Sequence, residues 1–245
     1  MNQTYMKEKK IFPLVMSMAL PMMLSMAFNS LYNIVDSYFV AKLSEDAMTA
    51  LSLVYPAQNL LTAVAVGFGV GVNAMISFYL GAQNQEKADK TATQGIVLGV
   101  LHGVLLMLLF LCGMNWFLGM FTKSDAVRAL GMEYSNVVFL FSVIVTGGIT
   151  LEKIFQAVGR MRATMVSMIA GFVTNIVLDP LLIFGIGPFP RMEIAGAALA
   201  TGIGQVITLL VYIIYYVLDP LPVKLRRTYL RPEGEICGKT YGIGI

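Results

Sequence analysis

Long apolar stretches separated by short polar segments recur along the whole chain. A helix that crosses the apolar part of a bilayer needs about 20 mostly apolar residues. Four stretches of roughly that length or more carry no Asp, Glu, Lys or Arg: 47–85, 91–122, 134–151 and 194–218. Two further stretches, 11–41 and 163–190, are each interrupted by a single charged residue, Asp36 and Asp179. The pattern therefore predicts an all-α polytopic membrane protein with six transmembrane helices.

The composition agrees with a chain that has lipid as its solvent. Of 245 residues, 57% are hydrophobic and 13% are charged, whereas charged residues make up about a quarter of a typical soluble domain. The first apolar stretch is longer than the roughly 7–15 residues of a signal-peptide core, so we expect it to stay in the membrane. Cys112 and Cys237 lie too far apart in this topology to predict a disulfide framework.

The net charge of +3 is better explained by membrane topology than by a nucleic-acid partner. Most basic residues lie in the N-terminal segment, the second and fourth loops and the C-terminal segment, and the alternate loops hold only Lys42, Lys123, Arg128 and Arg191. By the positive-inside rule, both termini are predicted to lie in the cytoplasm. The expected surroundings are a cell membrane, with the lipid bilayer as partner and no nucleic acid.

Asp36 and Asp179 are the candidate functional residues. A charged group inside a span costs about 2.5–3.5 kcal/mol on insertion scales, so it is a functional candidate by default. At about 1.5 Å per residue, Asp36 lies roughly 38 Å along the first helix and Asp179 roughly 24 Å along the fifth, both in the outer half. Two neighbouring carboxylates in a low dielectric cannot both stay ionised at low cost, so a proton or a bound cation is expected to neutralise one.

Three of the predicted helices carry polar stripes at helical spacing that would converge in a bundle: Asn29, Asn33 and Asp36; Asn175 and Asp179; Thr201, Gln205 and Thr208. Hydrogen bonds between helices are the alternative explanation, above all for Gln205 and Thr208. A hard cation such as sodium binds oxygen atoms, which Asp36, Asp179, the Asn175 amide and the Thr201 hydroxyl supply. Asp36 and Asp179 would be metal ligands only if sodium is the ion, and no other cofactor is expected.

The C-terminal segment 235–245 repeats the polar-to-apolar entry of 10–20 and predicts the start of a seventh helix. Six helices before it would make a second copy a parallel repeat, one of the repeat types of transporters. We therefore divide the chain into a six-helix N-terminal transmembrane lobe, 1–223, and a cytoplasmic inter-lobe linker with the start of a seventh helix, 224–245.

Several segments carry a more specific signal. They are Leu20-Pro21 with 33–40 (Asn-Ile-Val-Asp-Ser-Tyr-Phe-Val), 67–71 (Gly-Phe-Gly-Val-Gly) with Ile76-Ser77 and 80–82 (Leu-Gly-Ala), 175–185 (Asn-Ile-Val-Leu-Asp-Pro-Leu-Leu-Ile-Phe-Gly), and 196–201 (Gly-Ala-Ala-Leu-Ala-Thr) with Gly204-Gln205. Together they resemble the multidrug and toxic compound extrusion (MATE) family. Segment 156–162 departs from the common pattern because it lacks the usual acidic residue after Gly159, which leaves the branch of the family open.

The resemblance implies one lobe of a twelve-helix, two-lobe transporter whose C-terminal lobe is missing here. Such transporters exchange an inward proton or sodium ion for an outward organic cation or drug, and a bacterial plasma membrane is expected. By resemblance, Asp36, Asn175, Asp179 and Thr201 form the cation site of the N-terminal lobe. Tyr134 joins its network more weakly, and Asn33 and Tyr134 are assigned to the substrate cavity.

Three other functions stay open at this point. A lipid-linked precursor flippase of the same superfamily usually has a basic cavity, whereas no Lys or Arg is predicted deep in a span here. The second alternative is an intramembrane aspartyl protease. Such proteases resemble one another in a Gly-x-Gly-Asp motif, and neither Asp36 nor Asp179 lies in one, so we expect a protein that is not an enzyme. An inactive half-transporter fragment is the third alternative, because one lobe lacks the opposite wall of the cleft.

Overall fold

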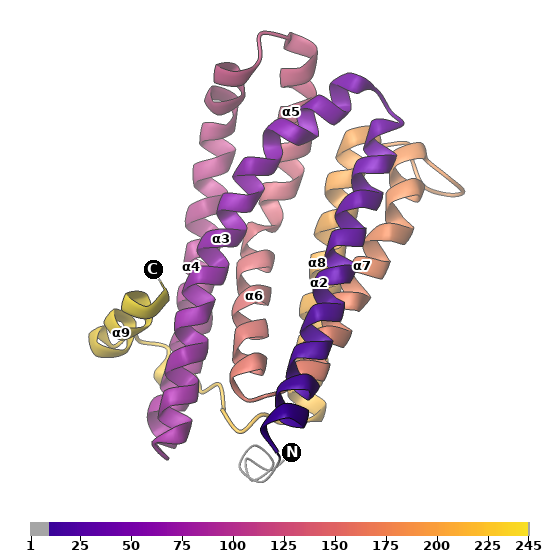
Figure 1. Cartoon of the computed structure of the whole chain (residues 1–245). Helices are drawn as coiled ribbons and strands as arrows, with labels where there is room; N and C mark the ends of the chain where they lie inside the picture. The colour runs from indigo at the N-terminus through magenta and orange to yellow at the C-terminus, as the bar shows by residue number, and fades with distance from the viewer. Residues whose placement is uncertain (1–9, 245) are drawn as a thin grey trace.

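The computed structural model describes residues 10–244, and these fold into a bundle of long helices (Figure 1). Six helical segments in this described part are long and apolar enough to cross a membrane. Their bounds are α2 Ile11–Ala41, α3 Glu45–Gly81, α4 Gln85–Phe121, the composite segment Asp125–Ala157, α7 Met161–Phe184 and α8 Glu193–Leu218. The predicted all-helical fold with six spans is confirmed.

Several helices extend beyond the apolar stretches that predicted them, because polar residues cap their first turns. Ser44 Oγ accepts a hydrogen bond from Ala47 N at 3.0 Å at the start of α3. Asn84 Oδ1 accepts one from Lys87 N at 3.0 Å at the start of α4. A cap of this kind satisfies backbone donors that have no partner inside the helix. The membrane helices therefore continue into their polar flanks.

The fourth span is interrupted at its middle. It consists of α5, Asp125–Val138, a 3₁₀ turn η1, Phe139–Phe141, and α6, Ser142–Ala157. Ser142 Oγ donates to Phe139 O at 2.6 Å across this turn, and the Phe139 ring stacks on Phe110 of α4 with centroids 4.5 Å apart. The hydropathy pattern predicted one uninterrupted span over 134–151. The local tightening was invisible in that pattern because Phe139 and its neighbours are apolar like the rest of the span.

The helices form two groups (Figure 1). One contains α2, α7 and α8, and the other contains α3, α4, α5 and α6. In the first group α7 and α8 approach closely at Gly171 and Gly204, where a Cβ atom added to Gly171 would lie 2.6 Å from Gly204 O. Small residues let membrane helices pack this closely. The approach fixes the register between the two helices that supply Asp179 and Thr201.

Beyond α8 the chain runs through an irregular connection with one 3₁₀ turn, η2 Arg227–Tyr229, into α9, Gly234–Gly244. The helix predicted at the C-terminal end is thus present over its described residues, while Ile245 lies outside them. α9 packs on α3, where a Cβ atom on Gly67 would lie 2.8 Å from Gly244 O. Tyr241 Oη also lies 2.8 Å from Nε2 of His102 on α4.

Candidate functional site

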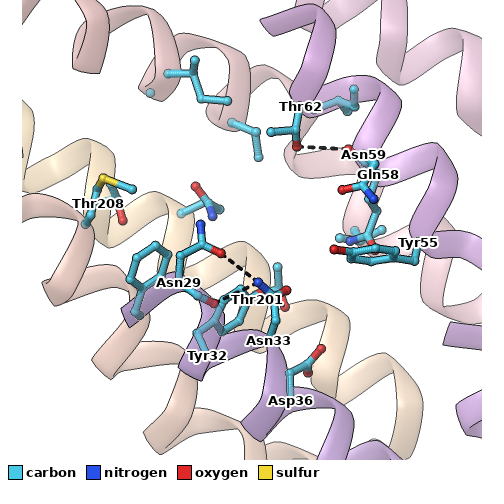
Figure 2. A pocket seen from close by; sticks show the side chains of 18 of the residues that line it. Asn29, Tyr32, Asn33, Asp36, Tyr55, Gln58, Asn59, Thr62, Thr201 and Thr208 are labelled. Atoms are coloured by element: carbon cyan, nitrogen blue, oxygen red, sulfur yellow. Dashed lines mark hydrogen bonds between the residues drawn. The ribbon is translucent and has the colours of Figure 1, made fainter. Parts of the chain in front are cut away.

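A cavity of about 1020 Å³ lies between the two groups of helices. Its walls come from α2, α7 and α8 on one side and from α3, α5 and α6 on the other. Figure 2 shows polar side chains of α2 and α3 across the cavity from one another, with Tyr55 and Gln58 of α3 opposite Asn33 and Asp36 of α2. Hydrogen-bonding groups therefore line the cavity of this bundle together with apolar side chains.

The polar stripe predicted on the first helix lines this cavity. Asn29, Asn33 and Asp36 all belong to the wall. Asn33 Nδ2 donates to both Asn29 O at 2.9 Å and Asn29 Oδ1 at 2.8 Å. Asn33 is thus part of the cavity wall, and its predicted role in binding substrate stays a prediction.

A second polar group lies behind the cavity wall, between α7 and α8. Asn175 Nδ2 donates to Asp179 Oδ1 at 3.2 Å and to Thr201 Oγ1 at 3.4 Å. The exposed fractions are 2% for Asn175, 0% for Asp179 and 8% for Thr201. Asn175 and Asp179 meet because they are one helical turn apart, and the close approach at Gly171 and Gly204 brings Thr201 to them.

Buried oxygen atoms without partners mark the same place. Asp36 Oδ1, Asp179 Oδ2 and Asn175 Oδ1 have no hydrogen-bond donor among the described residues. Asp36 is 6% exposed, and its helix α2 packs on α7, which carries Asp179. Buried polar atoms are nearly always paired, and an unpaired buried charge is costly. These oxygen atoms are therefore available to a proton or a cation.

The residues of the predicted cation site are thus brought to one region. Asn175, Asp179 and Thr201 are joined by hydrogen bonds, whereas Asp36 lines the same cavity as Thr201. Tyr134 is 1% exposed and lines the same cavity. Its hydroxyl accepts a hydrogen bond from Gln58 Nε2 at 3.3 Å. The hydrogen bond of the Tyr134 side chain is therefore with α3, on the wall opposite α2.

Tyr32 is a site residue that the sequence did not single out. Its hydroxyl lies 3.3 Å from Thr201 Oγ1, and its ring stacks on Phe172 with centroids 5.5 Å apart and planes inclined by 8°. Tyr32 lines the cavity and so connects it with Asp179 through Thr201 and Asn175. Its spacing of four from Asp36 was an available signal, but aromatic residues at that spacing are common in membrane helices that only pack.

One ion pair also lines the cavity, away from the aspartates. Lys153 Nζ lies 3.1 Å from Glu152 Oε1, and the side chains are 13% and 15% exposed. Gln156 Nε2 donates to the same Glu152 oxygen at 2.7 Å. The lysine charge is neutralised locally, so this pair does not make the cavity basic.

The donor set favours a hard cation over a transition metal. The residues that the structure describes contain no group of three or more His, Cys, Asp or Glu side chains able to hold a metal ion. Two carboxylates, one amide oxygen and one hydroxyl are instead the oxygen ligands that hard cations prefer. Sodium would fit the chemistry of Asp36, Asp179, Asn175 and Thr201.

Comparison with known proteins gives a consistent result. The family model MatE matches residues 21–181. The multidrug export protein MepA of Staphylococcus aureus (strain NCTC 8325 / PS 47) is 30% identical over 242 residues, which cover 98% of this chain and 53% of MepA. MepA of Staphylococcus saprophyticus is 28% identical over 98% of this chain and 52% of its own length. The chain therefore spans about half the length of the curated relatives it matches.

Solved structures share the fold. A MOP superfamily transporter from Pyrococcus furiosus, described as having a binding pocket of reverse polarity that suggests a different function, superposes with a TM-score of 0.87 at 27% identity, over 94% of this chain and 50% of that one. An outward-facing multidrug resistance MATE family transporter gives 0.87 at 27% identity, over 94% and 51%. A MATE structure in the bent conformation gives 0.85 at 29% identity, over 94% and 51%.

Proposed function

Because this chain belongs to the MatE family of multidrug efflux transporters, we propose that it forms the six-helix N-terminal half of an antiporter. The antiporter exports small organic cations in exchange for protons or sodium ions. It acts in a bacterial plasma membrane with both ends of this half in the cytoplasm, as the distribution of basic residues predicts. A second half of similar size completes the cleft, since this chain spans about half the length of its relatives.

The observation that carries the antiport proposal is the set of unpaired buried oxygens on Asp36, Asp179 and Asn175. Helix packing alone gives no reason to bury two carboxylates with free oxygen atoms, because each unpaired charge lowers stability. A coupling ion supplies the missing partner. Protonation would neutralise one carboxylate, and sodium would instead take the oxygens of Asp36, Asp179, Asn175 and Thr201.

The geometry suggests how ion and cargo influence one another. Asp36 lies on the cavity wall, whereas Asp179 lies behind it and is reached through Tyr32 and Thr201. An organic cation in the cavity is attracted by the ionised Asp36 and by aromatic faces such as Tyr32 and Tyr55. Neutralising the carboxylates weakens that attraction. Binding of the ion and of the cargo then oppose each other, which is the differential affinity that exchange requires.

The paired state of Lys153 favours cationic over anionic cargo. A lipid-linked flippase would need free basic groups for an anionic head group, and the lysine of the cavity wall is held by Glu152 at 3.1 Å. The flippase and the inactive half-transporter are therefore outcomes that the experiment must separate from antiport.

The test reconstitutes this chain with the second half of the transporter in proteoliposomes. Efflux of a fluorescent organic cation such as ethidium is measured under an imposed proton gradient and then under a sodium gradient. We expect one gradient to drive efflux, and Asp36→Asn and Asp179→Asn to reduce it at least tenfold. Asp125→Asn, a carboxylate in the first turn of α5 outside the cavity, is the matched control.

Each other outcome identifies an alternative. Full gradient-driven efflux in both cavity variants would overturn the coupling site. Transport of an anionic lipid-linked probe without efflux of the organic cation would favour the flippase. Absence of any transport in a folded, complete protein would favour the inactive half-transporter.

A further inference from the structure

The connection between α8 and α9, residues 219–233 and here named the strap, lies against the first turns of α4. In Figure 1 it leaves the base of α8 and passes α4 before entering α9. It contains no regular structure apart from η2, Arg227–Tyr229. Connections of this length without secondary structure usually have a function or are disordered. The strap is instead held at several points by side chains of α4.

Asp89 of α4 is the central contact. Its side chain is 3% exposed, although it does not line the cavity described above. Oδ1 accepts hydrogen bonds from Lys224 N at 2.9 Å and from Gln85 Nε2 at 2.8 Å, and Oδ2 lies 3.4 Å from Arg226 Nε. This carboxylate has its partners already, so the strap itself satisfies a charge that α4 buries.

Three further residues of α4 bind strap backbone. Gln85 Nε2 donates to Pro222 O at 2.8 Å. Thr93 Oγ1 accepts a hydrogen bond from Arg226 N at 3.1 Å. Gln94, which is 1% exposed, donates from Nε2 to Arg231 O at 3.0 Å and accepts at Oε1 from Glu233 N at 3.1 Å. Because backbone groups of several strap residues are bound individually, the contacts define one register of the strap along α4.

Apolar contacts, one further hydrogen bond and an ion pair support the same register. Leu221 and Val223 are 4% and 1% exposed and belong to the same core cluster as Tyr212 of α8. Leu225 N donates to Tyr216 Oη at 2.9 Å. On the outer side, Lys90 Nζ lies 2.8 Å from Glu233 Oε1. A strap that only bridged two helices would need none of these contacts.

We propose that Asp89, Thr93 and Gln94 form a docking surface that keeps the strap bound to this six-helix half at all times. The strap then behaves as part of the half rather than as a flexible linker. For a two-half transporter, a consequence that rests on the proposed function, movement between the halves would take place beyond the docked residues. Glu233 is the last strap residue whose backbone this surface holds.

Limited proteolysis of the full chain in detergent micelles tests the docking. The strap has four exposed basic residues. Trypsin can cleave after Lys224, Arg226 and Arg227, whereas Arg231 is followed by Pro232, and cleavage is followed by mass spectrometry. A protease needs a locally opened segment, so the cleavage rate reports the open population when opening and closing are fast. We expect slow cleavage of the wild-type strap. Asp89→Ala, Thr93→Val and Gln94→Ala should each accelerate it about tenfold or more, because each removes a hydrogen-bond partner of strap backbone groups.

Thr91→Val is the matched control. Thr91 is 1% exposed on the same helix, but its hydroxyl donates only to Lys87 O at 2.8 Å within α4. Cleavage of the Thr91→Val strap should stay within about twofold of wild type, since its substitution removes no strap contact. Elution as a monodisperse species and an unchanged melting temperature identify the variants that are folded.

Two results would overturn the docking proposal. One is a wild-type strap that is cut as fast as that of the folded Gln94→Ala variant. The other is equal acceleration by Thr91→Val and Thr93→Val, which would assign the effect to general loosening of α4. The measurement uses neither ion gradient nor cargo, so a failure of the antiport proposal leaves its outcome unaffected.

Discussion

The Asn175 amide donates a hydrogen bond to Asp179 Oδ1 at 3.2 Å, one turn along the same helix. The same nitrogen reaches Thr201 Oγ1 on α8 at 3.4 Å. The Asn175 Nδ2 group therefore donates to both neighbouring oxygen atoms. Asn175 Oδ1 and Asp179 Oδ2 have no hydrogen-bond partner in the described part of the chain. The asparagine orients the cluster and leaves oxygen atoms available for an ion.

Replacing Asn175 by Ala should weaken ion binding without unfolding the protein. The substitution removes one candidate ligand oxygen and the donor that orients Asp179, which corresponds to about 1–3 kcal/mol, or an affinity loss of about 5- to 150-fold. The measurement is the sodium-dependent or proton-dependent rise in melting temperature. An unchanged ion dependence in a folded Asn175→Ala variant would remove Asn175 from the site.

Replacing Asp179 by Asn should raise stability in the absence of the coupling ion and abolish coupling. The isosteric amide removes a buried charge that repels Asp36, and such replacements often stabilise by about 1–3 kcal/mol. Thermal unfolding of the chain in detergent gives the stability, and gradient-driven efflux in the complete transporter gives the coupling. A lower melting temperature together with intact efflux would contradict both parts.

Two substitutions at Tyr32 separate its hydroxyl from its ring. Tyr32→Phe loses the contact with Thr201 at 3.3 Å but can keep the stack on Phe172. We expect a change of about two- to tenfold in ion affinity, as for one hydrogen bond of about 0.5–1.5 kcal/mol. Tyr32→Ala should also reduce affinity for an aromatic cation, measured by fluorescence of the bound ligand. Unchanged ion affinity in Tyr32→Phe together with a loss in Tyr32→Ala would show that Tyr32 acts only through packing.

Replacing Gly204 by Ala should separate α7 from α8. A Cβ atom there would lie 2.8 Å from Gly171 O, a backbone atom, so we expect destabilisation of about 1–3 kcal/mol and weaker ion binding. Gly147→Ala is the control, because an added Cβ at Gly147 meets nothing within 4 Å and alanine favours a helix. Comparable losses in the two variants would contradict the assigned close contact. Melting temperatures of both variants decide the matter.

Much of the fold followed from local physics. In lipid, a run of apolar residues long enough to cross the bilayer can satisfy its backbone hydrogen bonds within the run only as a helix. The number of spans could therefore be predicted directly from the apolar runs. The aspartates stood out for the same reason, since each was the one charge in its stretch. The turn at Phe139–Phe141 and the extension of the helices to Glu45, Gln85 and Asp125 escaped the pattern, because hydropathy records neither caps nor local tightening.

The sequence by itself predicted that Asp36 and Asp179 lie in the outer halves of two separate helices, because spacing along a helix sets position along its axis and the face that a residue occupies. Only the tertiary structure decided which side chains meet them. Thr201 reaches Asn175 because α7 and α8 approach at Gly171 and Gly204, and Tyr32 reaches Thr201 from a third helix. The burial of Asp89 by the strap is of the same kind. Contacts between distant segments depend on how whole helix surfaces fit together, and no local pattern encodes that fit.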